Sequence, residues 1–84
     1  MSNLTLGNIA IEAQRAVRLN SQAYGDRVLR LFDDYTTQKQ LSYGGLKELR
    51  RAREIFCAHF YSGDSTNIHS MIQSLMLFAF KERN

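Results

Sequence analysis

The sequence of 84 residues contains no proline and only one cysteine, Cys57. Because proline ends or kinks a helix, its absence removes the strongest block to helix formation. A single cysteine excludes an internal disulfide, and the first residues lack the basic and apolar regions of a secretory signal. Together these absences predict a reducing compartment, most simply the cytoplasm.

Long apolar runs and a strong charge imbalance are also missing. The longest apolar run covers residues 75–80, far short of the about 20 residues that a membrane span needs. The net charge of +3 permits contact with nucleic acid but does not predict it. Apolar and charged fractions of 44% and 23% are ordinary for a globular protein. We therefore expect a single all-α domain over residues 1–84, with no membrane partner.

Apolar residues keep one helical phase through the first half of the chain. One side of a continuous helix would carry Ile9, Ala13, Val17, Tyr24, Val28, Leu31 and Tyr35. We call these seven residues the N-terminal stripe. Gly25 is the only helix breaker within it, yet the phase runs through Gly25 without a jump. We therefore predict one helix over about 5–38, straight or kinked at Gly25. A turn at Gly25 would instead give a compact four-helix monomer, with Asp26 capping the second helix.

Two shorter helices are predicted in the second half, after a glycine-containing connector at 41–45. The first of them, over about 45–61, has an apolar side formed by Leu46, Leu49, Ala52, Phe56, Cys57 and Phe60. The other, over about 65–82, carries apolar residues around most of its circumference, which is typical of a helix at a centre or in an interface. The sequence thus predicts a small three-helix protein.

The predicted helix lengths do not match. A helix over 5–38 would be about 50 Å long, whereas helices of some 17 residues reach only about 25 Å. The shorter pair would leave about half of the N-terminal stripe in water. A two-fold homodimer buries such a stripe most simply, so its residues are also candidate dimer contacts.

Residue types that carry catalysis or bind metals do not occur at the required spacings. His59 and His69 are the only histidines, and they fall on different predicted helices. Cys57 and His59 point about 160° apart on one helix and therefore cannot pair locally. Gly44 and Gly45 precede a helix but lack the remainder of a phosphate-binding loop. We expect no enzymatic activity, no metal and no cofactor.

The densest basic cluster comprises Lys47, Arg50 and Arg51, which are candidates for contact with nucleic acid. Glu48 and Glu54 interrupt this cluster. The connector before it is also longer than the turn of a helix-turn-helix motif. A small DNA-binding regulator is therefore an alternative function.

Six further residues are candidates for contact with another protein. Arg53 falls within the apolar side of its helix, where it has to reach the edge, pair with a carboxylate or meet a partner. The carboxylates available on the predicted first helix are Glu12, Asp26, Asp33 and Asp34. The other five candidates are apolar residues on otherwise polar helix sides: Ile11, Leu19, Leu29, Leu77 and Phe80.

Arginine, aromatic and surplus apolar residues of this kind are typical of protein interfaces. The sequence therefore favours a non-enzymatic, homodimeric protein of the adaptor, chaperone or inhibitor type. Such a protein holds or occludes a partner protein through helical surfaces. A structural subunit of a helical assembly is the second alternative.

Overall fold

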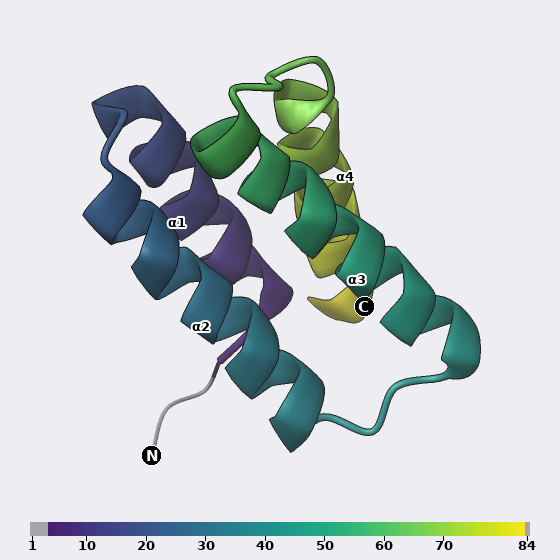
Figure 1. The fold of residues 1–84 in the computed structure, drawn as a ribbon. Coiled ribbons are helices and arrows are strands. Elements are labelled where there is room, and N and C mark those ends of the chain that lie inside the picture. Colours follow the sequence, from purple (N-terminus) through teal and green to yellow (C-terminus); the bar gives the residue numbers. More distant parts are fainter. Residues whose placement is uncertain (1–3, 84) are drawn as a thin grey trace.

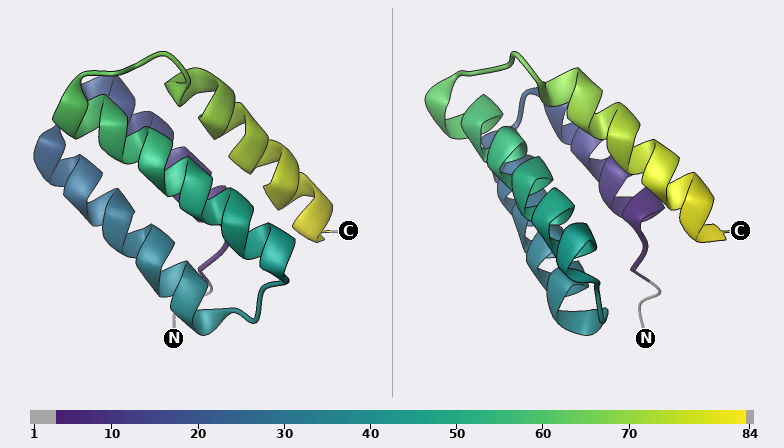
Figure 2. Two further views of the ribbon diagram at one scale, coloured as in Figure 1. Left: turned by 45° about the vertical axis from the view of Figure 1, so that its right-hand side comes forward. Right: turned by 90° about the vertical axis from the view of Figure 1, so that its right-hand side faces the viewer.

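The protein is an antiparallel bundle of four α-helices in the computed structural model, which describes residues 4–83 (Figure 1). The helices are α1 at Leu6–Leu19, α2 at Gln22–Gln38, α3 at Tyr43–Cys57 and α4 at Ile68–Arg83. They alternate in direction, and α3 closes the bundle between α2 and α4, opposite α1 (Figure 2). The predicted all-α fold is confirmed over these residues, but the helices number four and not three.

The predicted helix over 5–38 is wrong because the chain turns at Asn20 and Ser21. Asn20 adopts a left-handed backbone conformation with φ 50° and ψ 44°. Its N–H donates to the carbonyl of Val17, and the N–H of Ser21 donates to the carbonyl of Ala16. This pair of bonds is the Schellman arrangement that ends a helix. The Ser21 hydroxyl then accepts from the N–H of Tyr24 at 3.2 Å and caps α2.

Gly25, the expected position of a kink, lies inside α2 and is buried. A Cβ at this position would stand 3.1 Å from the ring of Phe60. Phe60 belongs to η1, a single π-helical turn at Ala58–Ser62 that continues α3. Gly25 therefore serves close packing between α2 and the end of α3, and it does not interrupt its helix.

The two C-terminal helices begin at other residues than the sequence predicts. Ser42 caps α3 by accepting from the N–H of Gly45 at 3.1 Å, so the glycine pair forms the first helical turn. Gly63, with φ 71°, ends the π-helical turn. An Asp64 side chain bonded to the N–H of Thr66 shapes the following loop, and α4 starts three residues later than predicted. No helix within residues 4–83 is both long enough and apolar enough to cross a membrane.

The N-terminal stripe lies between the helices of one chain. Ile9, Ala13, Val28 and Tyr35 are buried, and the remaining three members are partly buried against the core. The stripe is divided between α1 and α2, which are similar in length to α3 and α4. The apolar sides of α1 and α2 are therefore covered along their length by the other helices. The length mismatch that led to a homodimer through this stripe therefore does not exist in the structure.

Candidate functional site

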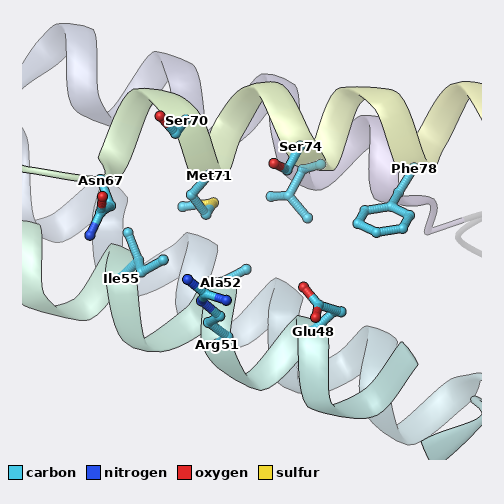
Figure 3. A pocket seen from close by; sticks show the side chains of 10 residues that line it. Glu48, Arg51, Ala52, Ile55, Asn67, Ser70, Met71, Ser74 and Phe78 are labelled. Carbon is cyan, nitrogen blue, oxygen red and sulfur yellow. The ribbon is translucent and has the colours of Figure 1, made fainter. Parts of the chain in front are cut away.

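A groove runs along the surface between α3 and α4 (Figure 3). It consists of two adjoining hollows of about 220 Å³ and 300 Å³. Both hollows are lined by Glu48, Leu75 and Phe78, so they form one continuous depression. We refer to it as the α3–α4 groove.

Apolar side chains line most of the 300 Å³ hollow and about half of the 220 Å³ hollow. The 220 Å³ hollow is lined by Ala52 and Ile55 of α3 and by Met71 of α4. The other hollow reaches the end of the bundle, where its lining includes Leu6, Tyr35, Leu41, Gly44, Gly45 and Leu49. Alanine and glycine extend little or no side chain, which leaves α3 and α4 incompletely closed against each other. The groove thus follows from small residues on α3.

Charged and polar side chains border this apolar lining. Figure 3 shows Glu48 and Arg51 rising from α3, opposite Met71 and Phe78 of α4. The border on the α4 side is uncharged and includes Ser74. Within the part of the chain that the structure describes, neither Glu48 nor Arg51 has an ion-pair or hydrogen-bond partner. The border therefore offers one charge of each sign, about 5 Å apart along the helix.

Arg53, in contrast, is paired. Its Nε donates to Asp33 Oδ1 at 2.9 Å and its Nη2 to Asp33 Oδ2 at 3.4 Å. Asp33 was one of four carboxylates considered for this role from the sequence. The pair joins α3 to α2 at a solvent-exposed position, where such pairs contribute at most about 1 kcal/mol. The structure thus gives Arg53 an intramolecular contact within a single chain.

The three basic candidates are exposed, and all three line one shallow depression on the outer side of α3. Arg50 also lines a shallow hollow against α2 together with Arg53. Arg51 also lines the α3–α4 groove. In the shared depression, Lys47 lies with Arg50 and Arg51 among the carboxylates of Glu48 and Glu54. The basic cluster of the sequence therefore forms one surface in the structure, and two carboxylates interrupt it.

The five apolar candidates separate into exposed and partly covered residues. Leu77 and Phe80 of α4 are 66% and 68% exposed, and Ile11 and Leu19 of α1 are more than half exposed. Leu29 is partly buried and packs against the core. None of the five lines the α3–α4 groove. The groove was not found from the sequence because it depends on which helices become neighbours.

The remaining polar clusters hold elements of the fold together. The Tyr24 hydroxyl donates to Glu12 and accepts from Arg15 Nη1 at 3.2 Å, which ties α2 to α1. The hydrogen bond to Tyr24 and the nearby Glu12 carboxylate raise the pKa of Arg15. His59 Nδ1 lies 2.8 Å from Ser65 Oγ and fixes the loop after η1. Over the described residues, no three His, Cys, Asp or Glu side chains gather around a possible metal position.

Comparison of the chain with protein-family models, curated proteins and solved structures gives no match. The candidate site therefore rests on the geometry of this chain alone.

Proposed function

We propose that the protein binds an amphipathic helix of another protein in the α3–α4 groove and acts by holding or occluding that segment, without turnover. The observation that carries this proposal is a solvent-open groove between two helices, whose lining is mainly apolar in one hollow and mixed apolar and polar in the other. Grooves of this kind accept helices whose apolar residues recur at positions i, i+3 or i+4, and i+7. An adaptor, chaperone or inhibitor of this type needs a complementary surface and no catalytic group.

The dimensions of the groove support a short helical ligand. Its α3 wall extends from Gly44 to Ile55, a distance of roughly 16 Å at 1.5 Å per residue. Three turns of a bound helix cover that length, and its apolar anchors span about 10 Å. The two hollows would then each receive at least one anchor, with Phe78 between them.

The two unpaired charges on the border give the proposed ligand a chemical signature. A carboxylate beside its apolar stripe would pair with Arg51, and a basic residue about one turn away would pair with Glu48. Complementary charges at the border select the partner and its orientation more than they add affinity. The groove therefore favours an amphipathic helix with one acidic and one basic flanking residue.

Copurification with variants at the groove and at a matched distant position tests this proposal. Ser74→Arg adds bulk and charge to the groove at an exposed position of α4. Thr37→Arg adds the same side chain to an exposed position of α2, outside the groove. We expect one stoichiometric protein to copurify with the wild type and with Thr37→Arg, but not with Ser74→Arg. Equal retention by both variants, or no copurifying protein at all, would contradict the proposal.

A further inference from the structure

The outer side of α4 differs from the rest of the surface in its lack of charge. Residues 68–80 of α4 contain no Asp, Glu, Lys or Arg. The exposed charged residues of α2 and α3 lie on the other side of the bundle, and they include Asp26, Arg27, Arg30, Asp34, Lys47 and Glu54. Depletion of charge is the compositional feature that marks the centre of protein interfaces.

Exposed apolar side chains concentrate on this uncharged face. Met76, Leu77 and Phe80 of α4 are 37%, 66% and 68% exposed, and helical spacing places them on one side. Ile11 of α1 is 52% exposed, and helical spacing from the Gly7 contact places it on the same side of the bundle. Its position follows from Gly7, one turn earlier, where a Cβ would stand 3.7 Å from Ala79 Cβ. We call Ile11, Met76, Leu77 and Phe80 the α1–α4 face.

We infer that the α1–α4 face is the interface between two copies of this chain, related by a two-fold axis. At roughly 200 Å² for a fully exposed side chain, its four residues present about 450 Å² of apolar surface. A standard interface buries about 800 Å² on each partner, of which some 56–58% is apolar. The face therefore supplies the apolar share that a stable dimer needs.

The four residues of the face have no charge with which to attract a charged partner, whereas a second copy presents the same apolar side chains. Each chain carries a net charge of +3, which gives two copies a weak overall repulsion that contact through an uncharged surface does not increase. Pairing through the α1–α4 face brings together four uncharged side chains, with the exposed Arg15 and Arg18 of α1 at its border. A two-fold axis makes one self-complementary face sufficient for a closed dimer. The α3 wall of the groove lies outside such an interface, whereas its α4 border at Ser74 is one turn from Leu77.

Sedimentation equilibrium of the full chain over about 5–200 μM tests this inference. We expect the wild type to associate from 9.7 kDa to a species of twice that mass. Leu77→Glu places a carboxylate in the face and should weaken dimerisation by at least about 30-fold, as loss of a central interface residue does. Tyr43→Glu is the matched control outside the face, because Tyr43 at the start of α3 is also a large exposed side chain, 83% exposed. It should alter the dissociation constant of the dimer by less than about 3-fold.

Circular dichroism separates lost association from lost folding. The Leu77 side chain is mostly exposed, so Leu77→Glu should keep the helical spectrum of the wild type. Leu77→Gln serves as a second, uncharged variant and should also weaken the dimer. A wild type that stays monomeric at 200 μM, a dimer that both Leu77 variants leave intact, or assembly beyond a dimer would overturn the inference. Arg51→Glu, in the α3 wall of the groove, should dimerise like the wild type, so the interface and the groove can fail independently.

Discussion

The left-handed backbone of Asn20 allows the break between α1 and α2 to be tested by two substitutions at one position. Asn20 has φ 50° and ψ 44°, and its side chain is exposed. A residue with a Cβ is disfavoured in this conformation by about 1–2 kcal/mol, and asparagine tolerates it better than alanine. We therefore expect Asn20→Gly to raise the free energy of unfolding and Asn20→Ala to lower it. The two variants should differ by about 1 kcal/mol in favour of glycine.

A continuous helix over 5–38 would rank the same two variants in the opposite order. In a helix interior, alanine gives a more stable protein than glycine by about 1 kcal/mol. The stability difference between Asn20→Gly and Asn20→Ala therefore has opposite signs for a break at Asn20 and for a continuous helix. Thermal unfolding followed by circular dichroism measures this, because 1 kcal/mol shifts the Tm of a domain this small by about 4–8 °C. Gln14, exposed in the middle of α1, is the matched control, and alanine should be the more stable variant there. Greater stability of Asn20→Ala than of Asn20→Gly would refute the break.

Two further predictions concern Gly25 and Asp64. Gly25→Ala should destabilise the protein by up to about 2 kcal/mol in urea unfolding, because overpacking against Phe60 exceeds the gain in helix propensity. The same change in a Phe60→Leu background should cost less, and a stabilising effect of Gly25→Ala alone would contradict the close contact. Hydrogen bonds from Thr66 lower the pKa of Asp64 below its ordinary value of 3.8. The ionised Asp64 carboxylate therefore stabilises the folded state above about pH 3.8, and this stabilisation is lost as the pH falls through the lowered pKa. A carboxyl midpoint at or above 3.8 in an NMR titration would be inconsistent with those bonds.

Helical class and burial could be predicted from the sequence because they depend on local pattern. The spacing of Ile9, Ala13, Val28 and Tyr35 places them on helix sides that the fold buries. The position of the first turn could not be predicted, because Asn20 looked like one more polar residue on a helix side. Two helices of a hairpin each have their own phase, so a phase preserved through Gly25 was no evidence for continuity. Glycine was the expected breaker, but asparagine adopts the left-handed conformation in this chain.

The candidate groove depends on contacts between distant parts of the chain, which periodicity does not specify. The pairing of α3 with α4 brings Glu48 and Arg51 opposite Phe78, about 30 residues later. Ala52 reads as an ordinary core residue in the sequence, and only the neighbouring helix turns its small size into a hollow. The pairing of Arg53 with Asp33 was among the possibilities that the sequence left open. Asp33 can be distinguished from the other three carboxylates only once the position of α2 beside α3 is known.

Site-specific photo-crosslinking from the groove tests the central claim most directly. A photoreactive amino acid at Ser74, in the full chain produced in its native cells, reports which protein occupies the groove. We predict that one partner protein is captured from Ser74 through an amphipathic helical segment, and that the same reagent at Thr37 does not capture it. Capture of the same proteins from both positions, or no capture from Ser74, would contradict a helix-binding role for this groove.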